Sequence, residues 1–151
     1  MNYERFLHWL SLVVYFPIIH RNYGGKPDEV YAYQATFQAN SLGFALQEFW
    51  KSENIMEMPG YEEHDVKHVL LQYGLSFKDE VAMQYFEFAN GNRSLTVWLV
   101  LLFGPLLQPW SVVHYIKAFQ RGRRAERVWT KSLKDYLTQP LNALRKEWRL
   151  C

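Results

Sequence analysis

Four side chains in the middle of the sequence have the types and the spacing of a metal site. The segment HDVKH supplies His64, Asp65 and His68, and Glu80 follows after eleven further residues. On a helix, residues four apart lie on one face about 6 Å apart, so the two imidazoles can reach one cation. Asp65 lies three residues before His68, on the flank of that face. One helix would therefore supply two nitrogen ligands and a carboxylate.

Glu80 can join this group only across a turn. A helix is predicted from Tyr61 to Gly74, where the glycine suits a left-handed stop. Ser76, followed three residues later by Asp79, resembles a capping box and predicts a second helix from Phe77 to Asn90. Antiparallel packing of the two helices would bring Glu80 to the height of the histidines.

The apolar residues of the first helix support this interpretation. They form a stripe on the side opposite the histidines, at Val66, Val69, Leu70 and Tyr73. The alternative is that the histidines are solvent-facing polar residues and that Asp65 only stabilises the helix dipole. The added aspartate and the placed glutamate favour a metal site.

The ligand types restrict the metal. Two histidines with two carboxylates suit a divalent ion, with zinc favoured over magnesium, manganese or iron, and leave positions for water or substrate. The single cysteine, Cys151, cannot form an internal disulfide. HDxxH also resembles the HExxH helix of zinc peptidases, but Asp is one methylene shorter than Glu and no third ligand of that class is evident. Peptidase activity is therefore a minor alternative.

The rest of the sequence is also predicted to be helical, because apolar residues recur at helical spacing without an alternating strand pattern. An apolar segment runs to Ile19, and a turn rich in Gly and Pro spans residues 20–28. A long helix is predicted from Asp28 to Trp50, followed by a loop over residues 51–60. The length suits one domain. We expect an all-α, single-domain helical bundle over residues 1–151.

A stretch of 20 uncharged residues runs from Ser94 to Val113. At about 1.5 Å per residue it could cross a bilayer core of roughly 30 Å. Gly104, Pro105 and Pro109 are predicted to break it in the middle. The alternatives are a membrane span, a buried broken helix and an element at the membrane surface. A broken helix could also leave a groove for a long apolar chain, although ordinary core packing explains the same residues nearly as well.

Charge divides the chain unevenly. Residues 1–116 carry 7 Lys and Arg against 12 Asp and Glu, whereas residues 117–151 carry 10 against 3. A basic helix is predicted from Ser111 to Gly122, continuing through Leu137, before a short helix that Pro140 opens. It would attract anionic headgroups or a diphosphate, with a solvated basic face as the alternative. No nucleic-acid motif accompanies the charge, so nucleic acid is not expected as a partner.

Other titratable residues are weaker candidates. His8, His20 and His114 stand alone, and each is expected to be structural rather than a ligand. Glu87 lies two helical turns after Glu80 and is expected at the surface, with a position behind the metal ligands as the alternative.

The HDxxH segment, the eleven-residue spacing and Glu80 together resemble the signature of the Coq-four family of ubiquinone (coenzyme Q) biosynthesis proteins. The sequence from His64 to Gly91 is similar to the family's central hairpin. Residues 115–122 and 140–145 resemble its C-terminal segment. The resemblance covers about residues 56–150.

This resemblance implies an all-helical, membrane-associated protein. Its expected function is a metal-dependent oxidative decarboxylation at the ring carboxyl of a polyprenylated hydroxybenzoate-type precursor. His64, Asp65, His68 and Glu80 would be the metal ligands and, through the metal, the catalytic residues. The alternative is a non-catalytic prenyl-lipid-binding scaffold of a quinone-biosynthesis complex, with a structural metal.

The resemblance also implies partners and a location. Other quinone-biosynthesis proteins and a membrane surface are expected partners, with a peripheral location on the cytoplasmic face of a membrane, or on the mitochondrial inner membrane of a eukaryote. Asp79 departs from the family, which commonly has Gly there, and Glu62 and Glu63 replace the usual basic residues. These departures concern the substrate more than the metal, and the prenyl tail could lie in a small tunnel or across a homodimer.

Overall fold

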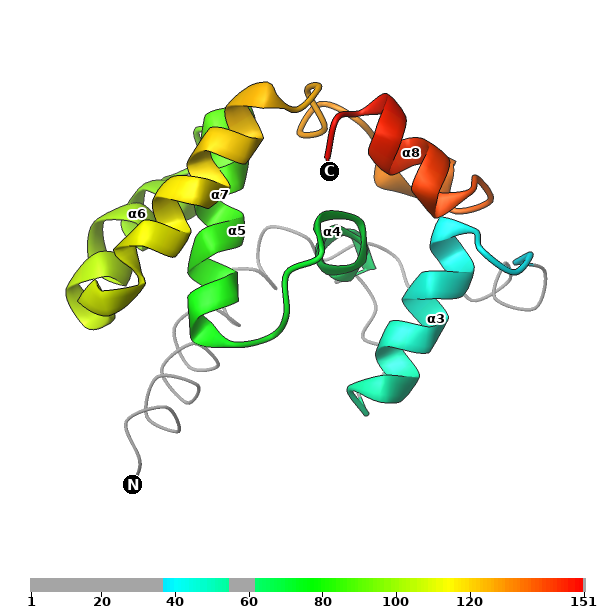
Figure 1. Cartoon of the computed structure of the whole chain (residues 1–151), viewed down its shortest axis with the longest axis horizontal. Helices are drawn as coiled ribbons and strands as arrows, with labels where there is room; N and C mark the ends of the chain where they lie inside the picture. Colours follow the sequence, from blue (N-terminus) through cyan, green and yellow to red (C-terminus); the bar gives the residue numbers. More distant parts are fainter. Residues whose placement is uncertain (1–36, 55–61, 151) are drawn as a thin grey trace.

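The computed structural model describes residues 37–54 and 62–150, and in this part of the chain every regular element is a helix (Figure 1). The all-α prediction is confirmed. The predicted apolar segment and turn before residue 28 lie outside the described residues. The elements are α3 (Leu42–Ser52), α4 (Glu62–Leu71), α5 (Phe77–Asn90), α6 (Leu95–Leu107), η3 (Pro109–Ser111), α7 (Val112–Arg124), η4 (Leu133–Tyr136) and α8 (Leu141–Glu147).

Helix α5 packs against both α6 and α7, while α4 lies between α5 and α3 (Figure 1). Glycines permit the close approach around α5. A Cβ at Gly122 of α7 would collide with the carbonyl oxygen of Phe86, and one at Gly104 of α6 would lie 2.6 Å from a methyl carbon of Val81. The hairpin of α4 and α5 therefore sits inside the fold, with helices on both sides.

Helix α3 begins later than predicted. Asn40 has a φ of +72°, and the side chain of Ser41 accepts a hydrogen bond from the Phe44 N–H, which makes Ser41 the N-cap. One continuous helix from Asp28 to Trp50 is therefore wrong. The buried face of α3 consists of Leu42, Gly43, Leu46 and Trp50.

Helix α4 ends three residues earlier than predicted, at Leu71. The left-handed residue is Gln72, with a φ of +58°, and not Gly74. Two guanidinium groups bind the last carbonyls of the helix: Arg121 donates to Leu71, and Arg145 donates to the two preceding carbonyls. These bonds satisfy the C-terminal carbonyls and favour an end at this position although Gln72 has a Cβ.

Helix α5 agrees with its predicted bounds. The Ser76 side chain accepts a hydrogen bond from the Asp79 N–H, and Gly91 closes the helix with a φ of +121°. Glu80 is consequently fixed in the first turn, facing α4.

The apolar run breaks at Gln108 and not at Gly104 or Pro105, because α6 continues through both. Pro105 has no N–H to donate to the Leu101 carbonyl, and the Tyr85 hydroxyl of α5 donates to that carbonyl at 3.1 Å. Within the described chain no single helix is long and apolar enough to span a membrane. The segment from α6 through η3 to α7 has the length and composition of a membrane span, but it bends by 109° at the break.

The predicted helical continuation through Leu137 is also wrong, since α7 ends at Arg124. The side-chain oxygen of Asn90, Oδ1, accepts hydrogen bonds from the N–H groups of Val128 and Trp129. The side-chain NH₂ group of Asn90 donates to the backbone carbonyls of Gly122 and Glu126. This buried side chain holds the segment after α7 in a non-helical path. The last helix, α8, begins directly after Pro140, as predicted.

Candidate metal centre

Three of the four predicted ligands converge between α4 and α5. His68 Nε2 lies 3.0 Å from His64 Nε2 and 3.2 Å from Glu80 Oε1. His64 Nε2 lies 3.6 Å from Glu80 Oε2. These ligand atoms all lie within 4.8 Å of one another and come from the two helices of the predicted hairpin.

His68 is held in one orientation and with one nitrogen free to bind. Its side chain is buried, and its Nδ1 lies 3.1 Å from the Tyr73 carbonyl oxygen, which can only accept a hydrogen bond. Nδ1 therefore carries the proton, and the lone pair of Nε2 points at the other two donors when the imidazole is neutral. A backbone carbonyl on the far nitrogen is a common support for a histidine that binds metal.

The charges of the three groups favour a negative Glu80. Burial alone would raise the pKa of Glu80, but the charge of His64 and the contacts with both imidazoles outweigh burial and hold that pKa well below its usual range. Burial would lower the pKa of His68, but the hydrogen bond and charge of Glu80 outweigh burial and raise that pKa above its usual value. The carboxylate is thus available as an anionic ligand.

The donor set fits a divalent cation. Glu80 Oε2 is buried and has no hydrogen-bond donor among the described residues. Two imidazole nitrogens facing each other need a shared proton or a cation between them. Donors that each bind one zinc ion at about 2.0–2.2 Å in tetrahedral directions are about 3.3–3.6 Å apart, close to the observed 3.0, 3.2 and 3.6 Å. A cation would satisfy all three donors together.

Asp65 does not belong to the three converging donors. Its Oδ2 accepts a hydrogen bond of 2.8 Å from the Trp50 indole of α3. Burial raises the pKa of Asp65, while the Trp50 hydrogen bond and the imidazole charges oppose that rise. Asp65 therefore lies beside the centre, and its role as a direct ligand remains a prediction.

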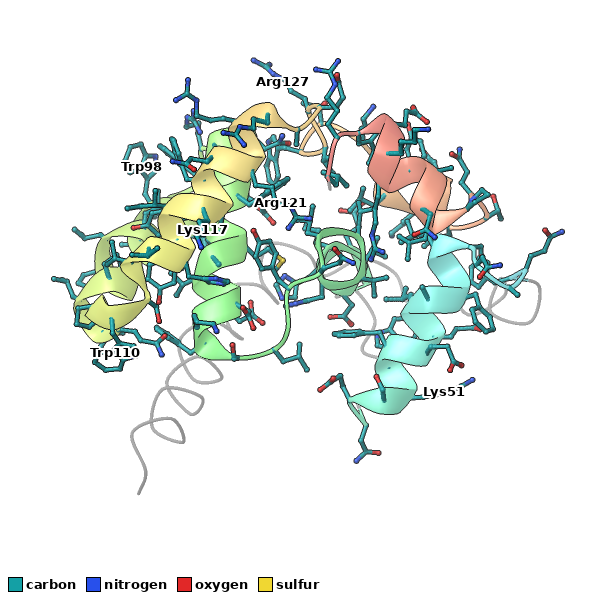
Figure 2. The ribbon with its side chains drawn as sticks, viewed as in Figure 1. Lys51, Trp98, Trp110, Lys117, Arg121 and Arg127 are labelled. Carbon is teal, nitrogen blue, oxygen red and sulfur yellow. The ribbon has the colours of Figure 1, made fainter. Side chains whose placement is uncertain are left out.

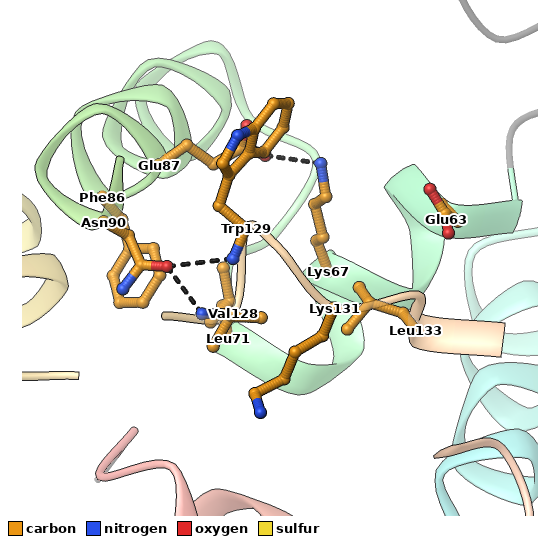
Figure 3. A pocket seen from close by; sticks show the side chains of 10 residues that line it. All are labelled: Glu63, Lys67, Leu71, Phe86, Glu87, Asn90, Val128, Trp129, Lys131 and Leu133. Carbon is orange, nitrogen blue, oxygen red and sulfur yellow. Dashed lines mark hydrogen bonds and ion pairs between the residues drawn. The ribbon is translucent and has the colours of Figure 1, made fainter. Parts of the chain in front are cut away.

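A second polar pair links the same two helices. Lys67 Nζ lies 2.9 Å from Glu87 Oε1, and Asn92 donates to the other oxygen of Glu87. The predicted surface position of Glu87 is wrong, because the residue is 5% exposed. The only feature of the sequence that could have indicated this buried position is the spacing of Glu87, two helical turns after Glu80. Figure 3 shows the pair lining a pocket of about 110 Å³ with Trp129 and Lys131.

Of the lone histidines, the structure describes His114, which is not among the three converging donors. His114 Nε2 lies 3.1 Å from Asp79 Oδ1, which supports its predicted structural role. The residue that departs from the family pattern, Asp79, thus has a partner on α7. His8 and His20 lie outside the described residues.

The apolar run forms an exposed surface and not an ordinary core. Only Val97 and Gly104 of α6 are buried. Trp98 and Trp110 lie on the outer side of the molecule (Figure 2), 52% and 66% exposed. We call this the apolar surface; its exposed members are Leu95, Trp98, Leu99, Leu102, Phe103, Leu106, Trp110, Val112, Val113 and Ile116.

The fold and the site define an all-helical protein with a candidate metal centre between α4 and α5. The predicted antiparallel packing of these two helices is wrong, because they cross: Figure 1 shows α4 end-on and α5 lengthwise. Over residues 58–151 the chain matches the family model of the coenzyme Q (ubiquinone) biosynthesis protein Coq4, and it belongs to that family. This confirms the resemblance and a role in ubiquinone biosynthesis.

A solved structure has a similar fold. It is the crystal structure of a Nostoc punctiforme protein assigned to ubiquinone biosynthesis, with a TM-score of 0.61 and 12% sequence identity. The similarity covers 99% of this chain and 82% of that one. No curated protein matches the chain.

Proposed function

We propose that this protein is a metal-dependent enzyme of ubiquinone biosynthesis that removes the ring carboxyl of a polyprenylated hydroxybenzoate-type precursor. The observation that carries the proposal is the convergence of His64, His68 and Glu80 on one point, with a buried carboxylate oxygen that lacks a donor among the described residues. Zinc is the proposed ion because its preferred ligands and distances suit this donor set.

The protein groups have defined tasks in this proposal. A divalent cation, when bound, supplies positive charge that can receive a carboxylate or a phenolate and stabilise charge developing on the ring. The Tyr73 carbonyl keeps the His68 Nε2 lone pair directed at the centre. Three protein donors leave coordination positions for the substrate. Phe49 of α3 stacks on His68, with ring centroids 5.8 Å apart, and so packs against this ligand from the side of α3.

The reaction balances with dioxygen as the oxidant and an external two-electron reductant. The bond between the ring and its carboxyl breaks, and the carboxyl leaves as CO₂. A carbon–oxygen bond forms at the same ring carbon, so that the substrate plus one oxygen atom gives a phenol plus CO₂. Dioxygen with two electrons and two protons supplies that atom and releases its second oxygen as water.

The test measures turnover on a prenylated hydroxybenzoate with dioxygen and a reductant, by mass spectrometry of the hydroxylated product. The zinc-loaded wild-type protein should form the product, Glu80→Gln should not, and Glu147→Gln on the exposed side of α8 should match the wild type. Product formation by Glu80→Gln, or none by the zinc-loaded wild type, would contradict the proposal.

A non-catalytic scaffold is the second candidate, and the apolar surface is the observation that favours it. Ten exposed large apolar residues, with tryptophans among them, are typical of a helix surface that lies in a membrane interface. We propose a peripheral location on this basis, with a prenyl lipid as ligand and other quinone-biosynthesis proteins as partners. In the scaffold case a chelator would lower the melting temperature, and ligand substitutions would act only through stability.

A further inference from the structure

Helix α3 supplies a wall of the metal centre, although the matched family region begins after this helix (Figure 1). Phe49 stacks on His68, with an angle of 13° between the rings. Trp50, the next residue, is 5% exposed and donates its indole N–H to Asp65. Two consecutive aromatic residues of α3 therefore contact two polar residues of α4, His68 and Asp65, that lie about one helical turn apart.

The hydrogen bond between Trp50 and Asp65 is more than packing requires. A core position that only needed volume could take a phenyl ring, whereas a buried indole N–H needs a hydrogen-bond partner, and here that partner is a carboxylate. Here the N–H reaches a carboxylate oxygen at 2.8 Å in a largely buried setting, where hydrogen bonds to charged groups are strong. The bond fixes the plane of the carboxylate.

Asp65 is also close enough to matter to the centre. The charges of His64, His68 and Glu80 all act on its carboxyl group. One oxygen is occupied by the indole, and the carboxylate places negative charge beside the imidazoles. Groups that hold the residues of a metal site in this way typically change metal affinity by 10–100-fold when they are removed.

We propose that Trp50 is a positioning residue of the metal centre, whose indole N–H fixes the Asp65 carboxylate beside the two histidines so that metal binding depends on this hydrogen bond. The inference rests on the metal centre of the proposed function and is independent of the reaction. It assigns a role to a residue outside the matched family region.

The experiment is a double-mutant cycle in the full chain, read as zinc affinity by competition with a chelating dye. Trp50→Phe, which keeps an aromatic ring but loses the N–H, should weaken zinc binding by ~10-fold. Asp65→Asn should weaken it by at least as much, and the double variant should bind no more weakly than Asp65→Asn. Trp98→Phe on exposed α6 is the matched control and should bind as the wild type does.

Unchanged zinc affinity in folded Trp50→Phe would overturn the inference, and so would a double variant whose loss equals the product of the two single losses. A measurement that needs no change at Trp50 covers the case in which Trp50→Phe does not fold. The indole signal that Asp65→Asn shifts most in ¹⁵N spectra should also move when zinc is added to the wild type. A signal that zinc leaves in place would overturn the inference. If the wild type shows no turnover but Trp50→Phe weakens zinc binding as expected, only the proposed reaction is contradicted.

Discussion

Two regions of the molecule differ in which side chains they bury. One is the interface between α4 and α5, and the other is the outer side of α6 and α7. Between α4 and α5, polar groups lie in the interior and contact one another: Lys67 contacts Glu87, and His68 contacts Glu80. On α6, large apolar groups lie outside and face solvent. Burial of paired polar groups and exposure of apolar ones both oppose the usual distribution of residues in a folded domain.

The comparison teaches where function should be sought. A buried polar cluster is costly unless its members bind each other or a ligand, so the α4–α5 interface points to an ion held inside the chain. An apolar surface of this size points to something outside the chain, such as a membrane. The two regions should therefore respond independently to substitution.

The largest expected effect is at the buried ion pair. Lys67→Met leaves the Glu87 charge in the interior without its cation and should lower the free energy of unfolding by ~3–5 kcal/mol. Lys67→Met with Glu87→Gln keeps an acceptor for Asn92, removes the unpaired charge and should recover most of the loss. Urea denaturation measures both, with exposed Lys117→Met as the control. A Lys67→Met loss no larger than that of the control would show that the interface does not depend on paired charges.

The next effect concerns the apolar surface. Leu102 and Leu106 are 61% and 70% exposed, and replacing both by Glu should weaken binding to anionic lipid vesicles. Full burial of one leucine side chain contributes ~1.5–3 kcal/mol, and the lower end of this range corresponds to about a tenfold loss for each residue. Vesicle sedimentation measures this, with Asn142→Glu and Ala143→Glu on exposed α8 as the matched pair.

Zinc affinity should be the same in the two charged variants, because the centre lies between other helices. Equal vesicle binding by both charged variants would show that the apolar surface does not bind the membrane. Loss of both zinc binding and vesicle binding in the α6 variant would show that the two regions are coupled.

The smallest effect lies where the two regions meet. Tyr85→Phe removes the hydroxyl that donates to the Leu101 carbonyl and should cost ~1 kcal/mol of unfolding free energy. Pro105→Ala restores an N–H within α6, so Tyr85→Phe should cost less in that background. Thermal and urea unfolding of the wild type, the two single variants and the double variant measure the coupling. Equal costs in both backgrounds would mean that the hydroxyl does not replace the missing backbone donor.

Local sequence patterns predicted the site better than the long elements. Spacing of four residues on a helix and a serine cap act over one or two turns, so the histidines and the start of α5 followed from the sequence. The end of α4 depends on Arg121 and Arg145, more than 45 residues away, and no local pattern contains that information.

The exposure of the apolar run and the Trp50–Asp65 hydrogen bond were not predicted, for similar reasons. The apolar run has helical spacing whether its face meets a core or a membrane, so periodicity cannot separate the two. The Trp50–Asp65 hydrogen bond joins residues 15 apart in sequence, across a segment outside the described residues. A tryptophan in an apolar helix face gives no local sign of its partner.

Zinc titration of the metal-stripped protein tests the central claim most directly. The wild type should bind one equivalent, and Glu80→Gln, which keeps the shape of the side chain and removes its charge, should weaken binding by at least ~100-fold while Glu147→Gln does not. Elemental analysis of the purified proteins should agree. Zinc bound equally well by the wild type and Glu80→Gln, or by neither, would contradict a metal centre built from His64, His68 and Glu80.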